Sequence, residues 1–103
     1  MPENLDTITQ LGLHYVKNDQ YDKACHFFQR AANIQKKEVK WGLMVASCYR
    51  RMGALNQALN LYKDINQKHP DNIECLKFLV QISKEMGLGY EMYAQTLHVL
   101  ERE

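Results

Sequence analysis

The residues in this sequence with the most capacity for chemistry are three cysteines and four histidines. They are Cys25, Cys48, Cys75, His14, His26, His69 and His98. Zinc sites pair such ligands at short spacings, but no CxxC occurs and the histidines do not complete a zinc-finger spacing. Each cysteine lies inside an apolar helical pattern, so we interpret all three as reduced thiols that fill small core positions. Reduced cysteines indicate a reducing compartment.

Other patterns that support catalysis are weak or missing. Gly87-Leu88-Gly89 lacks the third glycine and the preceding strand that a dinucleotide-binding loop requires. The sequence has no nucleophile paired with a base, no phosphate-cradling loop and no paired acidic motif. It therefore predicts a protein that is not an enzyme and that carries no metal and no cofactor.

Composition and charge narrow the class of partner. The chain has 103 residues, of which 46% are hydrophobic and 24% charged, and its formal net charge is +1. A nearly neutral chain has no general electrostatic attraction for nucleic acid. The start MPENLD is not a signal peptide, and no apolar run approaches the length of a membrane span. We expect a soluble cytoplasmic protein with no nucleic-acid partner and no membrane insertion.

The sequence is organised by a period of 34 residues, in which Tyr15 recurs as Tyr49 and Ala24 as Ala58. Other slots that recur are Leu11 and Val45, Gly12 and Ala46, and Phe28 and Tyr62. A period of this length indicates stacked supersecondary units. The units divide at 5–38, 39–72 and 73–103, and Pro70 ends the second one.

Each unit reads as two amphipathic helices. Apolar residues recur at i, i+3, i+4 and i+7, and small residues such as Gly12 and Ala46 allow the paired helix to approach closely. We expect helices at about residues 4–18, 21–36, 38–52, 55–69, 72–86 and 89–102.

The spacing and residue types resemble the tetratricopeptide repeat (TPR). The resemblance rests on Leu11, Gly12, Tyr15, Ala24, Phe28, Val45, Ala46, Tyr49, Ala58, Tyr62 and Pro70. It implies an all-α, right-handed helical solenoid of about three helix–turn–helix repeats. Gly42 departs from the pattern because that slot usually holds tryptophan, and Trp41 stands one residue earlier. The third unit also diverges, since Met92 stands in a slot for alanine.

The units 5–38 and 39–72 therefore read as TPR units, and 73–103 as a divergent terminal unit. Apolar residues near both ends indicate edges that need neighbouring repeats. They are Leu5, Ile8 and Val39 at one end and Tyr93, Leu97 and Leu100 at the other. We expect the chain to be a fragment of a longer array, from its C-terminal end.

The TPR resemblance implies a concave groove lined by the first helix of each unit. The candidate partner-binding residues on that mapping are Lys40, Leu43, Ser47, Arg50, Arg51, Lys77, Gln81 and Lys84. The set is basic, which suits an acidic peptide or helix, although a solvated face without a partner is the alternative for any single lysine. Trp41 reads as a core side chain, with a partner hot spot as the alternative.

A more specific resemblance covers most of the chain. The runs that carry it are LGLHYVKNDQYDKACHFFQRAANIQ (11–35), VKWGLMVASCYRR (39–51), YKDI (62–65), HPDNIECLKFLV (69–80) and MGL (86–88). They are similar to the last repeats of the Polaris-type subunits of intraflagellar transport complex B. The resemblance implies a non-enzymatic scaffold of the cilium or flagellum and the basal body. It would bind other complex B subunits, hold protein segments in the TPR groove and serve cilium assembly.

Two other functions use the same fold. A peptide-binding TPR adaptor or co-chaperone would hold a terminal carboxylate in a polar clamp. The corresponding positions are Thr9, Leu13, Met44, Glu74 and Phe78, and none matches. A helical-repeat RNA binder would repeat its basic residues in every unit, but Lys40 aligns with Asp6 and Glu74.

Overall fold

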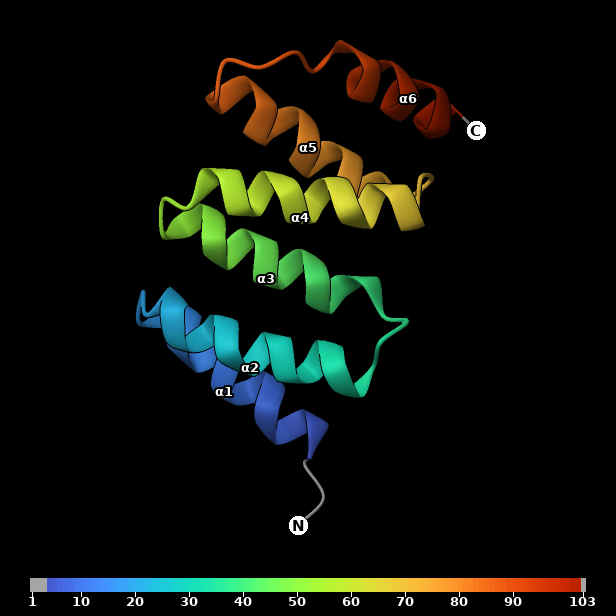
Figure 1. The fold of residues 1–103 in the computed structure, drawn as a ribbon. Coiled ribbons are helices and arrows are strands. Elements are labelled where there is room, and N and C mark those ends of the chain that lie inside the picture. Colours follow the sequence, from blue (N-terminus) through green and yellow to red (C-terminus); the bar gives the residue numbers. More distant parts are fainter. Residues whose placement is uncertain (1–3, 103) are drawn as a thin grey trace.

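The computed structural model describes residues 4–102, and six helices account for most of them (Figure 1). The helices are α1 Leu5–Lys17, α2 Tyr21–Ile34, α3 Val39–Arg51, α4 Leu55–Lys68, α5 Ile73–Glu85 and α6 Glu91–Arg102. Every predicted end lies within two residues of the observed one. The largest difference at a helix start is in the divergent unit, where α6 begins at Glu91 rather than 89.

The turns that separate the helices follow from local backbone chemistry. Gly53 and Gly87 have φ angles of +83° and +70°, the left-handed conformation that ends α3 and α5 without a steric penalty. Asn4 caps α1 through its side chain, and the Asn72 side chain accepts a 2.9 Å hydrogen bond from the backbone N–H of Cys75 at the start of α5. These caps and turns fix where each helix reverses direction.

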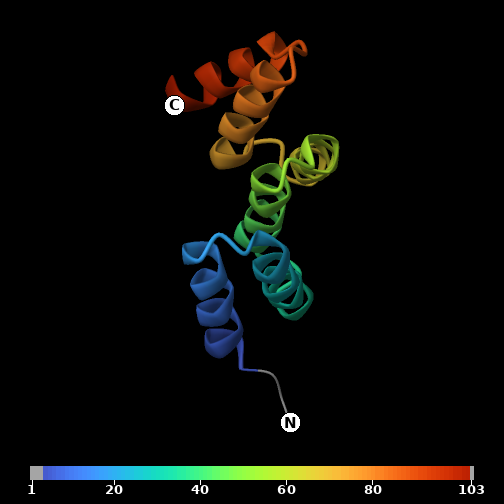
Figure 2. The same cartoon turned by 90° about the vertical axis from the view of Figure 1, so that its left-hand side faces the viewer.

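The helices stack into an elongated array that measures 45 × 28 × 19 Å. Each helix packs on the next one along the chain. In Figure 2, α2 and α4 lie on the right of the stack, α1 and α5 lie on the left, and α3 runs between them. The molecule is therefore a helical solenoid, and it presents one face built from α1, α3 and α5 and another built from α2 and α4.

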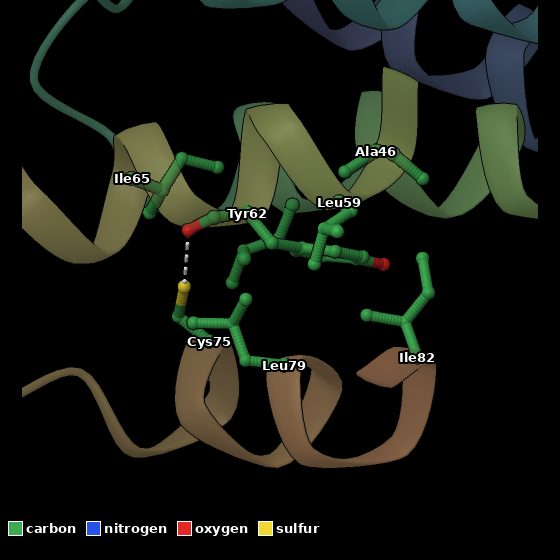
Figure 3. Close-up of a cluster of buried hydrophobic side chains, with 9 residues drawn as sticks. Ala46, Leu59, Tyr62, Ile65, Cys75, Leu79 and Ile82 are labelled. Carbon is green, nitrogen blue, oxygen red and sulfur yellow. Dashed lines mark hydrogen bonds between the residues drawn. The ribbon is translucent and has the colours of Figure 1, made fainter. Parts of the chain in front are cut away.

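Two buried clusters hold the array together, and α3 contributes to both. The first cluster joins α1, α2 and α3 and contains Ile8, Ala24, Cys25, Phe28, Ala31, Trp41, Val45 and Cys48. The second joins α3, α4 and α5 and contains Leu43, Ala46, Ala58, Leu59, Tyr62, Ile65, Cys75, Leu79 and Ile82 (Figure 3). The helix α3 therefore lies between the two clusters and contributes side chains to each.

Close packing in each cluster depends on small residues. A Cβ atom on Gly12 would lie 2.9 Å from two ring carbons of Phe28, so only glycine fits beneath that ring. Trp41 stacks on Phe28 with the two ring centroids 6.4 Å apart, and its indole N–H donates a 2.7 Å hydrogen bond to the side-chain oxygen of Gln35. Trp41 is therefore a core side chain.

Burial at the two ends differs in part from expectation. The expectation that Ile8 lies on an open edge is wrong, because this residue turns inward against α2 and is 4% exposed. Leu11 is 39% exposed, since no helix of residues 4–102 packs on the outer side of α1. At the other end Met92 is 81% exposed, and none of the residues of α6 is buried.

Candidate functional site

Two small pockets open on the face built from α1, α3 and α5, which we call the groove face. The first lies where α1 and α2 meet α3 and has a volume of about 200 Å³. Its lining residues are Val16, Tyr21, Phe28, Met44, Ser47, Cys48 and Arg51. Most of these are apolar or aromatic, and the Arg51 guanidinium lies 5.8 Å from the Tyr21 ring centroid. The pocket is therefore suited to an apolar side chain of a partner, and the Arg51 cation lies at the edge of the pocket.

The second pocket lies between α3 and α5 and has a volume of about 220 Å³. Its lining residues are Lys40, Leu43, Met44, Ser47, Glu74 and Phe78. The two pockets share Met44 and Ser47, so they adjoin on α3. Leu43 is only 8% exposed and belongs to the core, and it serves as part of a pocket wall rather than as a projecting contact.

Between the pockets, Ser47 is tied to the interior of the protein. Its hydroxyl lies 2.9 Å from the hydroxyl of the fully buried Tyr62 on α4. Burial raises the pKa of Tyr62, and the hydrogen bond with Ser47 lowers it. This bond satisfies a phenol that would otherwise be buried without a partner, so Ser47 has a structural role on the groove face.

Arg50 is held by an ion pair that spans two helices. Its guanidinium donates to the carboxylate of Glu85, with Nε 3.1 Å from Oε1. The hydrogen bond raises the pKa of Arg50 and lowers that of Glu85. The pair fastens the end of α3 to the end of α5, and it balances the charge of Arg50 on the groove face.

The candidate residues on α5 also have partners or lie apart from the pockets. Lys77 Nζ lies 3.9 Å from Glu101 on α6, and Lys84 Nζ lies 4.8 Å from the Tyr90 ring centroid. Gln81 is exposed and lines neither pocket. The predicted basic stripe is therefore divided, and Lys40 and Arg51 are its two cations that line a pocket.

Sequence reasoning missed the apolar walls of these pockets as a binding feature. Met44 and Phe78 occupy the same slot of the repeat, 34 residues apart, and both are half-buried side chains that line the α3–α5 pocket. A large apolar side chain that recurs on a face otherwise lined by charge is the signal that could have identified them. Tyr21 could not be found this way, because it reaches the pocket from the start of α2.

The three cysteine thiols are free and buried in the core. Burial raises the pKa of Cys48 and of Cys75 to about 11, so both thiols are protonated at neutral pH. Among residues 4–102, no group of three or more His, Cys, Asp or Glu side chains is placed to hold a metal ion. In the same part of the chain, no helix has the length and apolar character to cross a membrane.

No protein-family model matches the sequence. Among curated proteins, the chain is similar to the Intraflagellar transport protein 88 homolog of Homo sapiens, with 51% identity over 71 residues. The match covers 68% of this chain and 9% of that protein, so the chain spans less than a tenth of the length of its relative.

Solved structures share the fold at much lower identity. PcrH in complex with the chaperone binding region of PopB has a TM-score of 0.80 at 18% identity, over 93% of this chain and 79% of that one. SycD from Yersinia enterocolitica has a TM-score of 0.79 at 14% identity, over 99% and 76%. Together with the repeat period and the six stacked helices, these similarities show that the chain has the fold of tetratricopeptide-repeat solenoids and resembles part of the human intraflagellar transport protein 88 homolog.

Proposed function

We propose that this chain is part of a protein–protein interaction scaffold of intraflagellar transport complex B. The observation that carries the proposal is the 51% identity to the human intraflagellar transport protein 88 homolog. PcrH and SycD keep the fold at 18% and 14% identity. An identity of 51% is well above what the fold alone requires, and this favours a function shared with that relative.

The groove face is the proposed binding surface within this chain. Its two pockets stand on either side of Met44, and each has room for an apolar side chain. Arg51 lies at one pocket and Lys40 at the other. A partner segment with two apolar anchors and an acidic residue near Arg51 would complement this surface, because the anchors supply affinity and the charges fix the register.

The test uses purified complex B subunits, each measured for binding to the chain by calorimetry. Arg51→Glu should lower the affinity of the subunit that uses the groove face by about tenfold or more, because the new carboxylate would lie near the acidic residue of that partner. Lys63→Glu on α4 is the matched control, because Lys63 is an exposed lysine that lines neither pocket.

The outcomes separate function from site. If a complex B subunit binds the chain, and if Arg51→Glu weakens that binding while Lys63→Glu does not, the result would support both the scaffold function and the groove face as its site. Equal binding by both variants would keep the scaffold function and refute the groove face. If none of the purified subunits bound the chain, the scaffold function itself would be refuted for residues 1–103.

We also infer the place of action from the same relative. A complex B scaffold would work in the cytoplasm, at the basal body and in the cilium or flagellum, and would be required for cilium assembly. Deletion of this segment from the full-length protein of a ciliated cell should then shorten or abolish cilia. Cilia of normal length and number after the deletion would contradict this inference.

A peptide-binding TPR adaptor or co-chaperone is the second candidate. It is favoured by the likeness to PcrH, which was solved in complex with the chaperone binding region of PopB. Against it, Glu74 lines the α3–α5 pocket and would repel a terminal carboxylate. Binding of a free C-terminal chaperone peptide to the chain, with competition against complex B subunits, would favour this candidate.

A further inference from the structure

A broad cleft lies away from the groove face, between α2 and α4 with α3 as its floor. Its volume is about 690 Å³, and it is shallow and open. The lining residues are Gln29, Ala32, Asn33, Gly42, Val45, Tyr49, Gln57, Asn60, Leu61 and Asp64. Figure 2 shows α2 and α4 on one side of the stack, opposite α1 and α5. We call this surface the amide cleft.

The floor of the cleft is open because its residues are small. Gly42 contributes no side chain, and a Cβ atom there would lie 3.1 Å from Cδ1 and 3.6 Å from Cγ1 of the buried Ile65. Val45 on α3 and Ala32 on α2 add small apolar side chains to the lining. Because Gly42 lines the cleft through its backbone alone, the space above it is available to a small apolar group from outside.

The walls carry side-chain amides from two helices. Asn33 on α2 and Gln57 and Asn60 on α4 are exposed, and none of the three makes a side-chain hydrogen bond to another residue of 4–102. Gln29 donates a 3.1 Å hydrogen bond to the hydroxyl of Tyr49, which orients both groups at the cleft. An amide offers two donors and one acceptor oxygen, the same functions that a peptide group presents.

The cleft carries little charge. Its one ionisable carboxylate, Asp64, lies 3.4 Å from Lys68 in an i,i+4 ion pair on α4. The remaining polar groups are amides and a phenol. A charged ligand would lose hydration without gaining an opposite charge, so the surface is complementary to an uncharged partner.

We propose that the amide cleft binds an extended, uncharged segment of a partner protein through that segment's backbone. The amides of α2 and α4 pair with backbone N–H and C=O groups, and one small apolar side chain enters the space above Gly42. A helical segment is a poor fit, because its backbone groups are already paired with one another. The cleft would thus give the scaffold a second binding surface, separate from the groove face.

The test begins with random linear peptides displayed on phage and selected on the whole chain. The affinity of each selected peptide is then measured by calorimetry for the chain and for Asn33→Ala combined with Asn60→Ala. Because two hydrogen bonds are lost, the affinity of peptides that bind the cleft should fall by about tenfold. The double variant keeps its fold, since alanine at exposed helix positions favours the helix.

The matched control is Asn56→Ala combined with Gln67→Ala, two exposed amides of α4 that lie outside the cleft. It should leave peptide affinity unchanged. A second probe does not depend on the protein variant at all: N-methylation of single backbone amides in the selected peptide should weaken binding by about tenfold at one or two positions. Replacement of the peptide's side chains by alanine should lower its affinity mainly at the residue that lies above Gly42.

Three results would overturn the proposal. The selection could yield no peptide, the peptides could bind the cleft and control variants equally, or N-methylation could leave affinity unchanged at every position. If Arg51→Glu lowers the affinity of the peptides and the cleft variant does not, the bound segment lies on the groove face. A peptide that binds only when its side chains are charged would also contradict a cleft that recognises backbone.

Discussion

Among the glycines, Gly12 has the least room for a side chain. A Cβ on Gly12 would approach the Phe28 ring to 2.9 Å, a distance that side chains do not tolerate. Gly12→Ala should therefore lower the free energy of unfolding by about 1–3 kcal/mol, because the helices must separate or the ring must move. Urea denaturation followed by circular dichroism measures the change.

Gly42→Ala is the matched control for that prediction. Its new Cβ would meet the Ile65 side chain alone, with Cδ1 at 3.1 Å and Cγ1 at 3.6 Å, and Cδ1 is the far end of that side chain. The gain in helix propensity, up to about 1 kcal/mol, should offset much of the strain. An equal loss of stability in the two variants would contradict the close-approach role of Gly12.

The ion pair between Arg50 and Glu85 predicts a pH dependence. The Arg50 guanidinium lowers the pKa of Glu85 from its ordinary 4.5, so the pair stabilises the folded chain above pH 4.5 and this contribution is lost as the pH falls below the depressed pKa. Glu85→Gln should cost at most about 1 kcal/mol at neutral pH, since both side chains are partly exposed. Thermal unfolding of the two proteins should converge in acid, and a gap that persisted there would contradict the prediction.

The buried thiols predict a loss of stability in base. Burial raises the pKa of Cys48 and of Cys75 from 9.0 to about 11, so their contribution is complete below pH 9.0 and is lost as the pH rises toward 11. At neutral pH both should react with maleimide only when the protein opens. Rapid labelling of either thiol under native conditions, followed by mass spectrometry, would contradict this burial.

Among the elements, α6 is the least anchored. None of its residues is buried, whereas Leu79 of the neighbouring α5 is fully buried. Leu97→Ala in α6 should cost less stability than Leu79→Ala, for which about 2–5 kcal/mol is typical of a buried leucine. Amide hydrogen exchange should also be faster in α6 than in α5. Slow exchange across α6 would show that it is held more firmly than its burial indicates.

The sequence was most informative about elements and least informative about contacts between distant side chains. The 34-residue period predicted six helices, because each helix needs one apolar stripe and the stripe is visible in the residue types. The pairing of Arg50 with Glu85 could not be predicted, since it depends on how α3 and α5 cross and on the rotamers of two long side chains. The amide cleft was also missed, because amides spaced along two helices look like ordinary solvated surface.

At the scale of the molecule, the architecture is a linear chain of interfaces. Successive helices pack on one another, and the two buried clusters meet at α3, which contributes Trp41 and Val45 to one and Leu43 and Ala46 to the other. In such an array, stability is a sum of local terms and neighbour interfaces rather than one global core. A substitution in one cluster should therefore destabilise the helices of that cluster and leave the other end of the array largely unaffected.

Phe28→Ala and Leu79→Ala test that independence, because both side chains are fully buried and each belongs to one cluster. Phe28→Ala should speed amide exchange in α1 and α2 and leave α5 largely protected, since the cavity it creates lies on the far side of α3. Leu79→Ala should do the reverse. Exchange that rises uniformly across all six helices in both variants would instead show one cooperative unit, in which α3 transmits the loss from either cluster to the other.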